Sequence, residues 1–152
     1  PGEEEDREGK PFVGKSGKLL NQFLESIKDE NGVYDRTGYY ITNIVVWRPP
    51  GNRTPTFDEI ELMKPFVLEH IKIIDPLLIV PVGAVALKAL GIDGITSAQG
   101  RLHKIELDRC MRNVFPVYHP SYALRMPSKK HDLWISLLKM QQVYAKICSD
   151  KQ

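Results

Sequence analysis

Apolar residues recur along this chain with helical spacing in some segments and as unbroken runs in others. Helical spacing predicts longer helices over Ser16–Lys28, from Thr56 to Ile74 and over Asp132–Cys148, with a short helix at Val85–Leu90. Unbroken or alternating apolar runs predict strands at Tyr39–Trp47, Leu77–Gly83, His103–Leu107 and Asn113–Val117. Because these strands alternate with helices, we expect a three-layer α/β/α domain with a central, mostly parallel sheet of about four strands.

Polar residues mark where several of these elements should begin. The acidic segment Pro1–Arg7 predicts a solvated turn. Ser16 is placed to cap the first long helix, and Thr56 and Glu59 have the spacing of a capping box for the second. Ser121 is expected to cap a turn that follows the last strand.

The composition is that of a protein with an ordinary hydrophobic core. Hydrophobic residues make up 42% and charged residues 26% of the 152 positions, and no apolar run is long enough to span a membrane. The formal charge of +2 permits nucleic-acid binding without requiring it. Cys110 and Cys148 lack the spacing of metal ligands, and nothing indicates a disulfide framework, so we expect a reducing, cytoplasmic location.

Residues 1–152 are expected to form a single domain, because no repeat, low-complexity tract or linker divides them. The sequence begins at Pro1, with no initiator Met and no signal peptide. We therefore expect the true N-terminus to lie upstream of Pro1, so that the motif that begins the sequence is truncated.

Residues 9–16, GKPFVGKS, fit the phosphate-loop pattern G-x-x-x-x-G-K-[ST]. A phosphate loop needs an apolar strand directly before it, but here the preceding residues are acidic. Pro11 also removes one of the backbone N–H donors that would surround a phosphate. No later apolar strand ends in an Asp suited to holding a magnesium-bound water. A phosphate-loop nucleotide-binding protein is therefore the less favoured interpretation.

Polar side chains follow or interrupt the predicted strands. Asn43 lies inside an apolar run, Arg48 and Arg53 lie in the Pro- and Gly-rich loop after it, and His119 follows the last strand. Because open α/β sheets bind ligands at the carboxyl ends of their strands, we expect these residues and residues 1–12 to share one cleft. The alternatives are a structural Asn, solubilising arginines and a surface histidine.

The segments that carry these residues resemble family 4 uracil-DNA glycosylases, and the similarity covers nearly the whole chain. The matching segments are residues 1–6 (PGEEED), 9–14 (GKPFVG), 40–43 (YITN), 48–53 (RPPGNR) and 119–122 (HPSY) with Leu124 and Arg125. Each segment alone is a weak signal, but their order and spacing together are specific. The resemblance also accounts for the phosphate-loop match, since residues 9–14 form a motif of that family.

The resemblance implies a role for each matching residue in removing uracil, which enzymes acting on a base swing out of the DNA. Phe12 would stack on the base, Asn43 would read its polar edge, and His119 would donate to uracil O2 as the bond to C1′ breaks. Glu5 would position or activate water, and Gly2 would shape the pocket through its backbone. A carboxylate near the cationic sugar and a donor near the anionic base would stabilise both developing charges.

A second set of residues is expected to hold uracil-containing DNA, single- or double-stranded. The resemblance places Leu124 and Arg125 where the family wedges into the gap left in the duplex. The residues that we expect to contact DNA are Arg48, Arg53, Ser121, Leu124, Arg125 and Lys129. We expect a monomer that has no membrane partner.

Many members of the resembled family hold an iron–sulfur cluster through four cysteines, two of which would fall at Trp47 and Met63. Neither residue can supply a thiolate, and the other two positions would lie upstream of Pro1. We therefore expect no metal or cofactor, with Trp47 and Met63 filling that space by apolar packing. Because the cluster ligands are missing, a DNA-binding relative that has lost catalysis is the alternative to an active uracil-DNA glycosylase.

Overall fold

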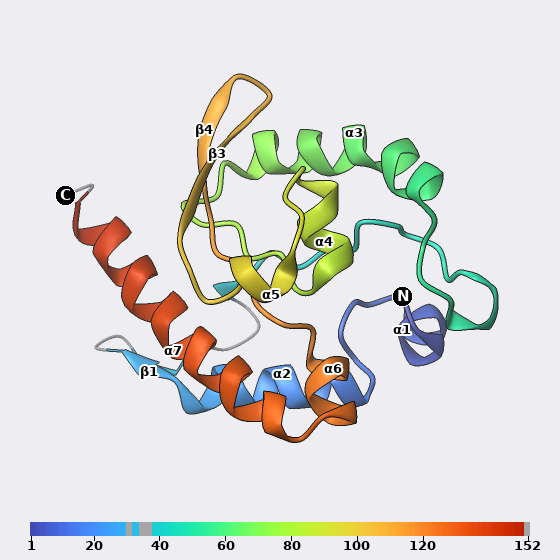
Figure 1. Cartoon of the computed structure of the whole chain (residues 1–152), viewed down its shortest axis with the longest axis horizontal. Helices are drawn as coiled ribbons and strands as arrows, with labels where there is room; N and C mark the ends of the chain where they lie inside the picture. Colours follow the sequence, from blue (N-terminus) through green and yellow to red (C-terminus); the bar gives the residue numbers. More distant parts are fainter. Residues whose placement is uncertain (30–31, 34–37, 151–152) are drawn as a thin grey trace.

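Helices form the larger part of the structure, a computed structural model that describes residues 1–29, 32–33 and 38–150. The helices are α1 (Glu3–Glu8), α2 (Lys15–Ser26), α3 (Phe57–Ile74), α4 (Ala84–Ala89), α5 (Ile95–Ala98), α6 (Pro120–Arg125) and α7 (Ser128–Ser149), with a short 3-10 turn, η2 (Pro50–Asn52). The strands are β1 (Lys28–Asp29), β2 (Gly32–Val33), β3 (His103–Leu107) and β4 (Cys110–Val114). Helix α3 lies along one side of the molecule, and α2, α6 and α7 pack together on the opposite side (Figure 1). No helix in the described ranges is long and apolar enough to cross a membrane.

The strands pair differently from the predicted sheet. β1 pairs with β2 and β3 pairs with β4, and both pairs are antiparallel. Among the residues that the structure describes, parallel pairing is confined to bridges between Ile79 and Val114 and between Val82 and Val117. The predicted sheet of about four mostly parallel strands is therefore not confirmed.

Two of the apolar runs predicted as strands do lie side by side and parallel. Backbone hydrogen bonds of 2.8–3.1 Å join them, from the N–H of Ile79 to the carbonyl of Asn113 through to the N–H of Gly83 and the carbonyl of Val117. Pro81 has no N–H, so it leaves a gap in this ladder. The pairing brings Gly83 and His119 together at the carboxyl ends of the two runs.

Residues 39–47, predicted as a central strand, instead lie in an irregular segment. In the described part of the chain, no backbone hydrogen bond pairs this segment with a strand. A β-branched and aromatic composition suits a pleated, half-buried surface, but it does not provide the neighbouring strand that a sheet needs. Asn43 therefore lies in irregular structure rather than inside a strand.

Two predicted element boundaries also differ from the structure. The acidic segment Pro1–Arg7, predicted as a solvated turn, contains helix α1, which ends at Gly9 with φ 65°. Acidic residues are favoured in the first turn of a helix, and a glycine in the left-handed region is a common helix end. Helix α7 begins at Ser128, one turn before the predicted start at Asp132.

The start of α3 is as predicted. The Thr56 hydroxyl accepts the Glu59 N–H at 3.2 Å, and the Glu59 carboxylate accepts the Thr56 N–H at 2.7 Å. This reciprocal pair is the capping box expected from the sequence, and it satisfies N–H groups that the first helical turn leaves without partners.

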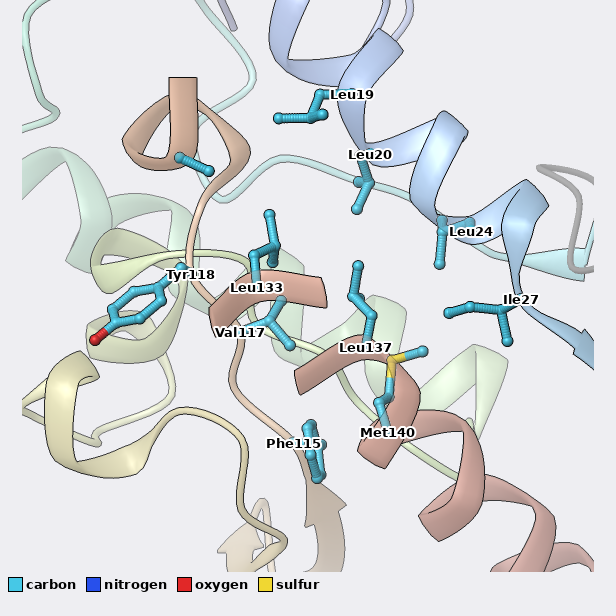
Figure 2. Close-up of a cluster of buried hydrophobic side chains, with 11 residues drawn as sticks. Leu19, Leu20, Leu24, Ile27, Phe115, Val117, Tyr118, Leu133, Leu137 and Met140 are labelled. Carbon is cyan, nitrogen blue, oxygen red and sulfur yellow. The ribbon is translucent and has the colours of Figure 1, made fainter. Parts of the chain in front are cut away.

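The main hydrophobic core joins α2 and α7 to the chain that leads into His119. Its buried members are Leu19, Leu20, Leu24, Ile27, Phe115, Val117, Tyr118, Ala123, Leu133, Leu137 and Met140. Figure 2 shows the leucines of α2 on one side of this cluster and Leu133 and Leu137 of α7 next to Val117. Fully burying one such side chain contributes about 1.5–3 kcal/mol, so this cluster holds the segment before His119 firmly against both helices.

Candidate active site

His119 lies where the buried run ends and helix α6 begins. Its backbone is extended, with φ −69° and ψ 135°, as expected for a residue that precedes a proline. The Nδ1 atom accepts the backbone N–H of Ser121 at 3.1 Å and lies 2.7 Å from the Ser121 hydroxyl oxygen. Because Nδ1 is an acceptor, a neutral imidazole carries its proton on Nε2. The expected Ser121 cap is therefore wrong in detail, since His119 is itself the helix cap and Ser121 donates to it.

The surroundings of His119 keep its imidazole uncharged at neutral pH. Burial lowers the pKa of His119 from the ordinary value of 6.5, and the positive charge of Arg125 lowers this pKa further. The Glu5 carboxylate acts in the opposite direction but does not outweigh them. A neutral imidazole with a proton on Nε2 can donate a hydrogen bond to a partner that becomes negative.

Phe12 covers one face of the imidazole. The two ring centroids lie 5.6 Å apart, and the ring planes are inclined by 29°. Phe12 has φ 53°, in the left-handed region that residues with a side chain seldom adopt. Gly17 of α2 makes this conformation possible, because a Cβ atom at residue 17 would overlap the carbonyl group of Phe12.

Glu5 of α1 is held at the N-terminus of α2. One carboxylate oxygen accepts the backbone N–H groups of Val13 at 3.0 Å and Gly14 at 2.8 Å. Burial alone would raise the pKa of Glu5, but hydrogen bonds from backbone N–H groups, Gly14 and Val13 among them, together lower it below 4.5. Gly2 lies against the other oxygen, since a Cβ atom at that position would come within 2.7 Å of it. Glu5 is therefore an ionised carboxylate at neutral pH, fixed next to the segment that carries Phe12.

The contact between Glu5 and residues 13–14 also argues against a phosphate loop in residues 9–16. The backbone N–H groups of Val13 and Gly14 would have to face a phosphate in such a loop, but they bind the Glu5 carboxylate. Gly14, not the predicted Ser16, is the N-cap of α2, and the carboxylate from α1 supplies the capping acceptor. The structure thus provides an internal anion where a nucleotide would have to bind.

Several residues expected to contact the base or DNA have other partners in the structure. Arg53 forms two hydrogen bonds with Glu59, at 2.7 and 2.8 Å, and this pairing lowers the pKa of Glu59 to about 2. Arg48 donates to Asn52 at 2.6 Å and lies 3.6 Å from the Glu3 carboxylate.

The other residues expected to contact the base or DNA differ in whether they form hydrogen bonds or ion pairs within the protein. Lys129 pairs with Asp132 at 2.8 Å. Leu124 and Arg125 are exposed on α6, and Arg125 has no hydrogen bond or ion pair within the described part of the chain. The side-chain amide of Asn43 is half-buried and likewise makes no hydrogen bond to another described residue. The structure thus joins Phe12, His119 and Ser121 through direct contacts. Glu5, which lies beside Gly2, is linked to them through the backbone of Val13, the residue after Phe12. Among the described residues, no hydrogen bond joins Asn43 to this group.

Two glycines near the site, Gly17 and Gly83, were not predicted from the sequence. Gly17 accommodates the Phe12 backbone, and Gly83 lies directly behind His119. Gly83 has φ 91° at the junction between the apolar run of residues 77–82 and helix α4. A glycine between a predicted strand and helix is a recognisable signal of an unusual backbone conformation, but the sequence does not reveal which side chain it faces.

Comparisons with known proteins identify the family of this chain. The chain matches the family described as the uracil DNA glycosylase superfamily over residues 1–144. It is 42% identical over 131 residues to a type-4 uracil-DNA glycosylase of Thermotoga maritima, covering 86% of this chain and 65% of the relative. It is 36% identical over 149 residues to one of Sulfurisphaera tokodaii, covering 94% of this chain and 66% of the relative. The chain belongs to the uracil DNA glycosylase superfamily, whose fold is of the α/β class.

Two further relatives show how the length of the match varies. A type-4 uracil-DNA glycosylase of Archaeoglobus fulgidus is 32% identical over 158 residues, which cover 75% of that protein. A DNA polymerase of Bacillus phage SP01 is 36% identical over 141 residues, which cover 92% of this chain but 14% of the polymerase. The chain spans just under two thirds of the Thermotoga and Sulfurisphaera relatives.

The contact between Glu5 and α2 predicts a specific loss of stability. Because the pKa of Glu5 is lowered by folding, its contribution is present above about pH 4.5 and is lost as the pH falls through the lower folded pKa. Glu5→Gln should reduce the free energy of unfolding at pH 7 by about 1–2 kcal/mol, the usual worth of a hydrogen-bonded cap. Urea unfolding at pH 7 and pH 3 measures this difference.

Glu8→Gln is the matched control, since Glu8 lies in the same helix and, among the residues that the structure describes, its side chain makes only an ion pair with Arg7 at 3.9 Å. It should change the unfolding free energy by less than about 0.5 kcal/mol. Equal effects of the two substitutions would show that the Glu5 contacts do not stabilise the start of α2.

Proposed function

We propose that this protein is a uracil-DNA glycosylase, which flips uracil out of DNA and hydrolyses its N-glycosidic bond to leave an abasic site. Membership of the superfamily and the names of the relatives support this activity. The observation that carries the proposal is the arrangement of His119. Its Nδ1 is engaged by Ser121, so the neutral ring has one donor, the Nε2–H group, left for a substrate.

The proposed chemistry separates two charges. When the bond between C1′ and the base breaks, its electron pair leaves with uracil, and the sugar becomes cationic. His119 donates from Nε2 to uracil O2 and so stabilises the anionic base. Glu5 is ionised, so it can stabilise the cationic sugar and orient the water whose oxygen attacks C1′. The attacking water gives up one proton and the anionic base takes up one, so the products are neutral uracil and an abasic site.

Phe12, Asn43 and Gly2 are proposed to bind the base. Phe12 already stacks on His119, so uracil can stack only on the other face of the Phe12 ring unless that ring moves. The amide of Asn43 makes no hydrogen bond to another described residue, which supports a role in reading the polar edge of uracil. Gly2 leaves room beside the Glu5 carboxylate that a side chain would fill.

We propose that Leu124 and Arg125 enter or border the gap left by the flipped nucleotide, with Ser121 nearby. Their exposure on α6, directly after His119, supports this placement. Arg48, Arg53 and Lys129 remain proposed phosphate contacts, although each of them would have to share its charge with a carboxylate that it already approaches.

We propose that the protein works without an iron–sulfur cluster. At the two positions where the resembled family places cysteines, Met63 packs against the cluster of Val45, Ile60 and Ala89, as expected. Trp47 is 37% exposed, so the apolar packing expected of Trp47 is wrong. Within the described ranges, no three His, Cys, Asp or Glu side chains are arranged to hold a metal ion. The residues present therefore do not fit a cluster, and no step above depends on one.

We also propose that the protein acts as a monomer in the cytoplasm. Cys110 is exposed and Cys148 is half-buried, and both are free thiols, which suits a reducing compartment. We likewise propose a three-layer arrangement around a parallel sheet. The parallel pairing of residues 79–82 with residues 114–117 supports this arrangement.

Removing the imidazole tests the proposed activity. With a uracil-containing oligonucleotide and alkaline cleavage of abasic sites, His119→Ala should lower the single-turnover rate by about 100- to 1,000-fold. DNA binding should weaken far less, because the donor acts mainly on the charge that develops in the transition state. His131→Ala is the matched control, since His131 is exposed on α7. Wild-type protein that binds this DNA without forming abasic sites would contradict the proposal and indicate a non-catalytic relative.

Arg125 is predicted to contact a phosphate. Arg125→Ala should flatten the dependence of log K on log salt by about one unit, for uracil-containing and plain DNA alike. Arg53→Ala should change the slope less, because Glu59 already neutralises that guanidinium. The DNA affinity of each variant, measured from about 50 to 200 mM salt, gives the slopes to be compared. An unchanged slope for Arg125→Ala would make Arg125 ordinary surface charge.

The purified protein is predicted to contain no stoichiometric iron. Trp47 and Met63 cannot supply thiolates, so chelators and oxidants should leave the unfolding curve unchanged. Metal analysis and the visible absorption spectrum provide the measurement. Iron in stoichiometric amount, together with a cluster absorption band, would contradict this prediction.

A further inference from the structure

Gly83 lies directly behind the imidazole of His119. A Cβ atom at Gly83 would come within 2.8 Å of the His119 Cβ, 3.5 Å of its Cγ and 3.6 Å of its Cδ2. Real side chains do not approach so closely, so an added methyl group would force one of the two residues to move. The φ of 91° at Gly83 is also one that residues with a side chain rarely adopt.

The backbone around Gly83 leaves it little freedom to retreat. Its N–H donates to the carbonyl of Val117 at 2.8 Å, and the N–H of Val117 donates to the carbonyl of Pro81 at 3.1 Å. Gly83 is also the N-cap of α4, and its carbonyl accepts the Leu87 N–H at 3.1 Å. These bonds tie Gly83 to the same run of chain that leads into His119.

His119 has equally little freedom to move away. Phe12 stacks on its ring, Ser121 holds Nδ1, and Pro120 fixes the chain after it. We propose that Gly83 is a positioning residue for His119, because its lack of a side chain sets where the imidazole sits and therefore where Nε2–H points. This inference rests on the proposed glycosylase function. Displacing a catalytic group by about 1 Å can lower a rate by about 100-fold.

Gly83→Ala is the direct test, and Gly91→Ala is its matched control. Gly91 ends the same helix region with φ 80°, but a Cβ atom there would have no neighbour within 4 Å. Both substitutions place a side chain at a positive φ, while only the first meets His119. Gly83→Ala should lower the single-turnover cleavage rate about 10- to 100-fold with less than about a threefold change in DNA affinity. Gly91→Ala should leave the rate within about twofold of wild type. Equal rates for the two variants would overturn the proposal.

A double-mutant cycle with His119→Gly separates positioning from general stability, because that change removes the Cβ that Gly83→Ala would meet. In the His119→Gly background, Gly83→Ala should cause no further loss of rate, and its effect on melting temperature should be smaller than in the wild-type background. If Gly83→Ala alone does not fold, recovery of folding in the His119→Gly background supports the contact, and failure in both backgrounds overturns it.

Failure of the proposed function would be recognised separately. If the wild-type protein does not cleave uracil from DNA, the glycosylase proposal fails. The melting-temperature cycle and the imidazole NMR signals of His119 still report whether Gly83→Ala displaces that ring. Unchanged imidazole signals in Gly83→Ala would overturn the positioning role whatever the activity.

Discussion

The site depends on the fixed position of one imidazole. His119 ends an apolar run whose other members, Phe115 and Val117, are buried between α2 and α7. The same run pairs in parallel with residues 79–83, so core packing and backbone bonds together fix the chain before His119. Since Ser121 engages Nδ1, this fixed chain also determines which ring nitrogen carries the proton.

Helix α2 links this core to Glu5 and Phe12, the site residues near the N-terminus. Its leucines bury one face in the core, while the N–H groups of Val13 and Gly14, directly before the helix, hold the Glu5 carboxylate. Gly17, one turn further along, gives room to the Phe12 backbone, and the Phe12 ring stacks on His119. Helix α2 therefore brings Glu5 and Phe12, near the N-terminus, close to His119, more than 100 residues later in the sequence.

The sequence predicts the site better than it predicts the sheet. Motif residues such as Glu5 and His119 are chemically distinctive, and the apolar spacing of α2 and α7 follows directly from burial of one helix face. Strand pairing depends instead on neighbours far away in the sequence, so the apolar composition of residues 39–47 could not establish a partner.

Contacts across the fold explain the remaining differences. Ser121 was expected to cap α6, yet the neighbouring His119 side chain takes that place because Pro120 holds it extended over the helix start. The phosphate-loop pattern in residues 9–16 does form a helix N-terminus, but the N–H groups of Val13 and Gly14 there donate to the Glu5 carboxylate of another helix. The closeness of Gly83 to His119 likewise arises only when two parallel runs are paired.

The protonation state of His119 is the most direct test of this account. Long-range proton–nitrogen NMR correlations of the ¹⁵N-labelled protein, recorded from about pH 5 to 8, report the tautomer and pKa of each histidine. Loss of one signal set in His119→Ala assigns that residue. The account predicts a proton on Nε2, an unprotonated Nδ1 and a pKa for His119 below 6.5. A proton on Nδ1 of the neutral ring, or a pKa above 6.5, would contradict it.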